Sequence, residues 1–186
     1  MILWLGLGAG LATGLGMSKW RGQTYRYPVL NHIWLIFVGF LPQLLVIYLG
    51  TNRVTIPDWV AALSIVTSQF LLLIFAWLNR HSPGMLILIV GLILNLAVIL
   101  ANDGFMPIDP NTAGRVVGTE RIAAFEVGSR IGYKDILLPA ADTNLKWLAD
   151  RFLPPAWFPY QVAFSLGDIL IAAGAFGLLA FQKPNV

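Results

Sequence analysis

Residues 85–107 read MLILIVGLILNLAVILANDGFMP, an apolar run that stops at a polar turn. Between residues 85 and 101 the only polar side chain is Asn95. A helix of about 20 apolar residues crosses the hydrocarbon of a bilayer, and a slightly shorter one can do so if it stands upright. Glycine and proline in the following turn interrupt helical backbone. The stretch therefore predicts a membrane-spanning helix over residues 85–101.

Apolar residues dominate the rest of the chain as well. Of its 186 residues, 58% are hydrophobic and 11% are charged, whereas soluble domains carry about 25% charged residues. A water-soluble fold of this size could not hide so much apolar surface. We therefore expect lipid to be the solvent for much of the chain, and we predict a multi-pass protein of the inner (plasma) membrane.

Several classes of function are excluded by what the sequence lacks. The net charge is only +3 and no run of like charges occurs, so no nucleic-acid partner is expected. The absence of cysteine excludes disulfides, thiolate metal sites and iron–sulfur clusters. The two histidines, His32 and His81, lack the spacing of a helical metal site. We predict no metal site, no catalytic residue and no cofactor, and we leave a bound lipid or pigment open.

Four further apolar stretches resemble residues 85–101 in length and character. They cover residues 1–17, 30–50, 59–78 and 162–181. Together the stretches predict an all-α fold, a polytopic transmembrane helix bundle of about five spans that forms one membrane domain over residues 1–186. The long segment 102–161 then lies in a single loop.

Basic residues set the expected orientation of these spans. Lys19, Arg21 and Arg26 follow the first apolar stretch, Arg80 lies in the tight turn before residue 85, and Lys183 lies in the C-terminal tail. Basic residues collect on the cytoplasmic side of membrane proteins. The pattern predicts an external N-terminus, a cytoplasmic C-terminus and an external loop over residues 102–161.

The external loop is too long to be structureless. Asp109-Pro110 is typical of a helix start, with an N-cap followed by proline. Residues 143–152 place Leu145, Leu148 and Phe152 on one side, which predicts a short helix lying flat on the membrane. Aromatic residues then form an interfacial belt before the last span: Trp157, Phe158, Tyr160 and Phe164.

Small residues recur at helical spacing in the first and last apolar stretches. Gly6, Gly10 and Gly14 are each four residues apart, which allows close approach of another helix. Small residues in the last stretch have a similar pattern: Ala163, Gly167, Ala173 and Gly177. The spacing fits helix packing within one subunit or docking onto another protein, and it does not separate the two.

Polar residues are expected to meet at the outer end of the last two spans. Ser165 to Asp168 has the pattern of a capping box, with Ser165 as the N-cap and Asp168 three residues later. The expected cluster consists of Asn95, Asn102, Asp103, Ser165 and Asp168. It fits either a hydrogen-bonded lock between two helices or a site for an ion or substrate.

The turn at Asn102 to Pro107 and the helix start at Ser165 to Asp168 support a family resemblance. The chain resembles a bacterial family of uncharacterised multi-pass membrane proteins, a domain-of-unknown-function family with an Asn-x-Gly-x-Met-Pro turn and a Ser-x-Gly-Asp start to the last helix. This chain has Asp103 where the family pattern has a second glycine, and it lacks a loop histidine near Tyr133. The resemblance implies a topology and no activity.

The functional prediction follows from the small-residue faces, the interfacial aromatics and the scarcity of buried charge. We predict a non-catalytic accessory or assembly subunit of a larger membrane complex, for example in respiratory or photosynthetic electron transfer. Its partners would be the lipid bilayer and other membrane subunits. The alternative is a small oligomeric transporter or membrane-embedded enzyme that uses the region of Asp103 and Asp168.

Overall fold

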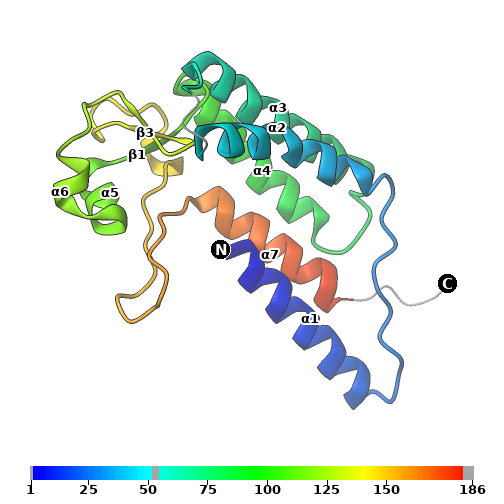
Figure 1. The fold of residues 1–186 in the computed structure, drawn as a ribbon. Coiled ribbons are helices and arrows are strands. Elements are labelled where there is room, and N and C mark those ends of the chain that lie inside the picture. The colour runs from blue at the N-terminus through cyan, green and yellow to red at the C-terminus, as the bar shows by residue number, and fades with distance from the viewer. Residues whose placement is uncertain (1, 52–54, 182–186) are drawn as a thin grey trace.

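The computed structural model describes residues 2–51 and 55–181 (Figure 1). Its long helices are α1 (Ile2–Trp20), α2 (Trp34–Thr51), α3 (Asp58–Leu78), α4 (Met85–Ala101) and α7 (Leu166–Ala180). The smaller elements lie between α4 and α7: β1 (Met106–Ile108), α5 (Pro110–Val117), α6 (Thr119–Ile122), β2 (Arg130–Ile131), β3 (Asp135–Leu137) and the 3-10 helix η1 (Lys146–Leu148).

The long helices lie side by side in the spatial order α1, α7, α4, α3, α2 (Figure 1). The last helix of the chain therefore packs between the first and the fourth. Gly6 lies against Ala172 and Gly10 against Phe176, so α1 and α7 run in the same direction. A Cβ atom added to Gly10 would lie 2.6 Å from the Phe176 carbonyl oxygen. This contact is close enough that only glycine fits.

Residues 102–165, which we call the head, lie at one end of the helices; the sheet, α5 and α6 form a lobe there, and the segment before α7 extends away from it (Figure 1). Its sheet has the order β1-β3-β2. Met106 pairs with Asp135 in the parallel ladder of β1 and β3, and β2 pairs with β3 in the antiparallel sense. The Asp109 side chain accepts a hydrogen bond from the Asn111 N–H and caps α5, so the predicted helix start there is confirmed.

The head is joined to the helices by a continuous apolar core. Val98 and Ile99 at the end of α4 pack in one cluster with Phe105 and Met106 of the following turn, and Ile136 of β3 completes it. Asn102 N–H and Gly104 N–H both donate to the Ile99 carbonyl, which fixes the turn between α4 and β1. Burial of this apolar surface therefore holds the sheet against the ends of the helices.

The prediction of a bundle of about five spans is wrong. Among the residues that the structure describes, α3 alone is both long and apolar enough to cross a membrane. Helices α4 and α7 have 17 and 15 residues, and at 1.5 Å per residue they extend roughly 26 Å and 22 Å, short of the roughly 30 Å of hydrocarbon. α1 is longer, but its glycines and Lys19 lower its hydropathy. The last span is shorter than predicted because α7 starts at Leu166 instead of residue 162.

The prediction of an all-α fold is also wrong, because the head contains a sheet. Its strands have two or three residues each, too few to produce a visible alternation of apolar and polar side chains. The predicted helix at 143–152 is reduced to η1, because Leu145 before it is left-handed and Ala149 after it is extended. The tail with Lys183, used for the predicted orientation, lies outside the described residues.

Candidate functional site

The capping box predicted at the start of α7 is present. The Asp168 N–H donates to the Ser165 Oγ at 3.0 Å, and the Ser165 N–H donates to the Asp168 Oδ2 at 3.1 Å. The carboxylate therefore satisfies a backbone donor at the N-terminus of the helix, where the helix dipole also favours negative charge.

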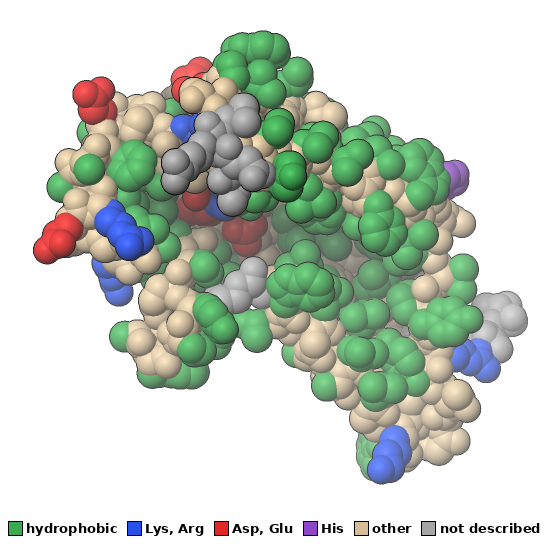
Figure 2. Space-filling model, in the orientation of Figure 1, with side chains coloured by type: hydrophobic (Ala, Val, Ile, Leu, Met, Phe, Trp, Pro, Cys, Tyr) green, Lys and Arg blue, Asp and Glu red, His purple; other side chains and the backbone are tan. Residues whose placement is uncertain are grey.

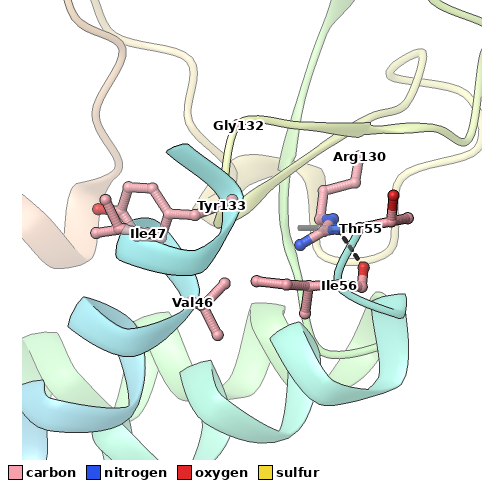
Figure 3. Close-up of a pocket in the computed structure, with 8 residues that line it drawn as sticks. Val46, Ile47, Thr55, Ile56, Arg130, Gly132 and Tyr133 are labelled. Carbon is pink, nitrogen blue, oxygen red and sulfur yellow. Dashed lines mark hydrogen bonds between the residues drawn. The ribbon is translucent and has the colours of Figure 1, made fainter. Parts of the chain in front are cut away.

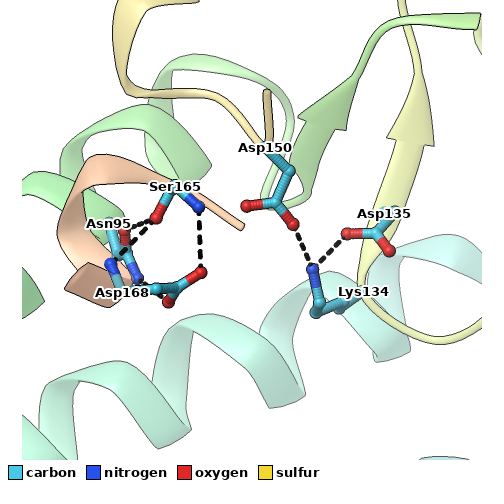
Figure 4. Close-up of polar contacts among 6 residues, drawn as sticks. All are labelled: Asn95, Lys134, Asp135, Asp150, Ser165 and Asp168. Atoms are coloured by element: carbon cyan, nitrogen blue, oxygen red, sulfur yellow. Dashed lines mark hydrogen bonds and ion pairs between the residues drawn. The ribbon is translucent and has the colours of Figure 1, made fainter. Parts of the chain in front are cut away.

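Asn95 of α4 completes this group (Figure 4). Its Nδ2 donates to the Asp168 Oδ1 at 2.9 Å, and its Oδ1 accepts a hydrogen bond of 2.8 Å from the Ser165 hydroxyl. Asn95 and Ser165 are both buried. Gly167 leaves room for the amide, since a Cβ atom there would collide with the Asn95 side chain. Asn95, Ser165 and Asp168 thus form a closed hydrogen-bonded lock between α4 and α7.

The other two residues of the expected cluster lie elsewhere. Asn102 is buried, but its side chain donates to the Val98 and Asn144 carbonyls and accepts from the Asn144 N–H. Asp103 has a φ of 55° and an exposed side chain. Asn102 is two helical turns beyond Asn95, roughly 10 Å along the axis. The amides of Asn95 and Asn102 therefore contact different residues, although the two lie on one face of the helix.

A second polar group, which the sequence analysis missed, lies beside the lock. Figure 4 shows Lys134 between Asp135 and Asp150. The Lys134 ammonium is 2.6 Å from the Asp150 Oδ2 and also forms an ion pair with Asp135. The Asp150 side chain is only 1% exposed. In sequence these residues look like ordinary loop charges, and no motif marks them.

Strand β1 places these charges together. The Met106 N–H donates to the Lys134 carbonyl on one side of the strand, and the Asp150 N–H donates to the Pro107 carbonyl. A parallel bridge between Ile108 and Asp150 continues the second contact. The turn that ends α4 thus leads into the strand that brings together two segments from distant parts of the head.

The surroundings of Asp150 and Lys134 shift the pKa values of both side chains. Burial raises the pKa of Asp150 to about 7, and the carboxylates of Asp135 and Asp168 add to this rise, although the Lys134 ammonium opposes it. Burial alone would lower the pKa of Lys134, but Asp135 and Asp150 raise it above its usual value. Part of the Lys134 side chain, 36% of it, reaches solvent, while its ammonium lies between the two carboxylates.

Tyr133 links this group to a cavity of about 410 Å³ (Figure 3). Burial raises the pKa of the Tyr133 phenol above its usual value, and the charges of Lys134, Asp135, Asp150 and Asp168 also act on it. Arg130 borders the cavity, donates to the Ile56 carbonyl at 2.8 Å and forms an ion pair with Asp58 at 3.0 Å. The cavity is lined by Val46, Ile47, Gly50, Thr55, Ile56, Arg130, Gly132 and Tyr133. Arg130 is therefore already engaged within the chain.

The small residues predicted for helix packing lie mostly within the chain's own interfaces. Gly6, Gly10 and Gly14 approach the backbone of α7 at Ala172, Phe176 and Leu179. Gly167 and Gly177 face α4 and the turn before it, where their neighbours are Asn95 and Gly84, whereas Ala173 is exposed. The structure therefore assigns the glycine face of α1 to packing inside this chain.

The described residues contain no group of three or more His, Asp or Glu side chains placed to hold a metal ion. His32 and His81 are both exposed. The ring of His32 lies 6.4 Å from that of its neighbour Trp34, in an edge-on arrangement. The side chains at the two polar groups and the cavity carry carboxylates, an ammonium, a guanidinium, a phenol, a hydroxyl and an amide.

Comparison with known proteins adds a family assignment. No curated protein and no solved structure matches the chain significantly. A family of unknown function, DUF5317, matches residues 28–180, which include α2, α3, α4, the head and α7. The match covers more than half of the sequence and includes both polar groups. The chain therefore belongs to DUF5317, a family of unknown function.

Proposed function

We propose that this chain is a non-catalytic accessory or assembly subunit of a larger membrane complex, held in the plasma membrane as a multi-pass protein. The observation that carries the proposal is the exposure of large apolar side chains along the helices. Trp4 of α1 is 76% exposed and Phe37 of α2 is 72% exposed. Soluble monomers rarely expose contiguous apolar patches of more than a few hundred Å².

The distribution of this surface supports membrane embedding. Figure 2 shows hydrophobic side chains over the face presented by α2 and α3, while acidic side chains gather at the head and Lys and Arg side chains lie both there and at the far end of α1. Large exposed apolar residues recur on α2 (Phe37, Leu41, Leu44), on α3 (Leu63, Ile74, Trp77) and on α4 (Leu86, Val90, Ile93). Lipid or an apolar partner would remove this surface from water. The shorter helices would fit a bilayer that thins locally around the protein.

The polar residues support a structural role. Hydrogen bonds join the side chains of Asn95, Ser165 and Asp168. The Asn102 amide donates to the Asn144 carbonyl. Arg130 is engaged by Asp58 and by a backbone carbonyl. Such bonds stabilise the head on the helices and leave the apolar faces as the surface available for assembly.

The proposal is tested by purification from native membranes in mild detergent. We expect foreign membrane subunits in fixed stoichiometry, and we expect Phe37→Ala with Leu41→Ala on α2 to release them. The matched control is Val117→Ala with Val127→Ala, an exposed apolar pair in the head and away from the long helices. A monodisperse chain without foreign subunits, unchanged by either pair of substitutions, would contradict the proposal.

One observation favours the second candidate, a small transporter or membrane-embedded enzyme. Asp168 is only partly buried, and its charge acts on both Asp150 and Tyr133. Figure 2 also shows a hollow between α2 and α1 with acidic side chains at its head end. Asp103, whose side chain is exposed in the turn after α4, is not part of this group. Flux of protons or ions into vesicles containing the purified chain, abolished by Asp168→Asn, would favour this candidate.

A further inference from the structure

The Asp150 carboxylate is buried and only half satisfied. Its Oδ2 is bound by the Lys134 ammonium at 2.6 Å, while its Oδ1 is buried and has no hydrogen-bond partner among the described residues. Figure 4 shows Oδ1 turned away from Lys134, toward the side on which Ser165 and Asp168 lie. A buried carboxylate oxygen that is ionised and has no hydrogen-bond donor destabilises the folded state, since a buried charge must be paired and hydrogen-bonded.

The charges around Asp150 do not balance if every group is ionised. Lys134 supplies one positive charge, and Asp135 shares it with Asp150. Asp168 adds a third carboxylate from α7, and Tyr133 is the remaining titratable neighbour. Strand β1, which also packs against Asp150, contributes the Pro107 carbonyl and no titratable side chain. Three carboxylates therefore act on one another around one ammonium, and Asp150 is the most deeply buried of the three.

We propose that Asp150 is a buried proton-binding site at the junction of the head and the helices, held by Lys134 through Oδ2 and protonated on Oδ1. Protonation removes one of the three negative charges and leaves a neutral carboxyl, and a neutral buried oxygen without a partner costs less free energy than an ionised one. The step is a simple acid dissociation, in which the carboxyl O–H bond breaks and the proton passes to water. Burial, which raises the pKa of Asp150 to about 7, supports the same assignment.

Proton release should loosen the junction. The negative charge of an ionised Asp150 would repel that of Asp168. Its Oδ1 would also gain no donor, because the Lys134 ammonium is already shared between Asp135 and Asp150. The segment that carries Asp150 is attached to β1 and, through Phe152 and Phe164, to the chain just before α7. Its attachment therefore depends on whether the proton is bound.

The sign of the pH effect follows from linkage. A carboxyl whose pKa is raised in the folded state keeps its proton after the unfolded chain has lost it, so stability falls as the pH rises from about 4 to about 7. Lys134 stays charged throughout this range, because its pKa is raised. If the lysine holds Asp150 ionised in the folded protein, the pKa of Asp150 lies at or below its unfolded value, and no fall in stability is expected over this range.

The test compares thermal unfolding of the full chain and of Asp150→Asn in the same detergent between pH 4 and pH 8. We expect the melting temperature of the wild type relative to the variant to fall across this range. The control is Asp142→Asn, which removes an exposed carboxylate of the head outside this group and should retain the fall. A melting-temperature difference between the wild type and Asp150→Asn that stays constant or grows as the pH rises would overturn the proposal.

A second measurement does not depend on the variant folding. Infrared difference spectra of the wild-type chain, recorded with and without isotope-labelled aspartate, should show the C=O band of a protonated aspartic acid that disappears as the pH rises. In Asp150→Asn, if it folds, this band should be lost. Absence of any protonated aspartate band in the folded wild type at pH 5 would also overturn the proposal.

Discussion

Asn95 on α4 and Asp168 on α7 are joined by a hydrogen bond of 2.9 Å across 73 residues of sequence. The same amide accepts a hydrogen bond from Ser165, so one side chain bonds both members of the capping box. The bond ties the start of the last helix to a helix from the middle of the chain. Local helix capping and long-range packing thus meet at Asn95.

Replacing Asn95 with leucine should destabilise the protein strongly. The change would leave the buried Ser165 hydroxyl without its acceptor, which costs about 1–3 kcal/mol, and would also remove the donor to the Asp168 Oδ1. Thermal unfolding in detergent measures the loss. Asn111→Ala is the control, because the Asn111 side chain is exposed on the head. Equal melting temperatures for the two variants would show that the lock contributes little.

Asp168→Asn should lower stability rather than remove an activity. The amide keeps one acceptor oxygen but loses the charge at the start of α7, where a capping carboxylate contributes about 0.5–2 kcal/mol. The comparison to make is the melting temperature against growth or ion flux. Wild-type stability together with complete loss of flux would instead support the transporter candidate.

Gly10→Ala should prevent the normal contact of α1 with α7. The added methyl group would lie 2.6 Å from the Phe176 carbonyl, and such overpacking costs about 1–3 kcal/mol. Gly8→Ala is a matched control on the same helix, because a Cβ atom there meets nothing within 4 Å. We expect aggregation or a lower melting temperature for the first variant alone. If Gly10→Ala folds normally and only loses a foreign subunit, the glycine face is an interface with another protein.

The cysteine-free sequence permits a direct test of membrane embedding by single-cysteine variants. Leu63 on α3 is 57% exposed in the structure, and Asp142 in the head is exposed as well. In open membrane sheets, a water-soluble thiol reagent should modify Asp142→Cys and spare Leu63→Cys, because lipid suppresses thiolate formation and access. Both should react after denaturation. Equal labelling in native membranes would contradict embedding of α3.

Local sequence was sufficient where the determining interactions are local. The prediction of a helix over residues 85–101 matches α4, and the caps at Asp109 and Ser165 are present as predicted. Helix starts depend on hydrogen bonds within three residues, so their pattern can be read without knowing the fold. The apolar composition likewise indicated that much of the surface is unsuited to water.

Only the tertiary structure decided the partners of each segment. The pairing of Met106 with Asp135, the Lys134 bridge to Asp150 and the contact of Gly10 with Phe176 all join residues far apart in sequence. The same glycine spacing fits an internal or an external partner, and short strands carry no periodic signal. Helix length was not a tertiary matter in these two cases: α4 has the predicted bounds, and α7 is shorter than predicted because its local capping box starts it at Leu166. The sequence determined which segments are apolar and where some of the helices begin. Three-dimensional packing determined which segments contact one another, because those contacts link residues that no local sequence pattern relates.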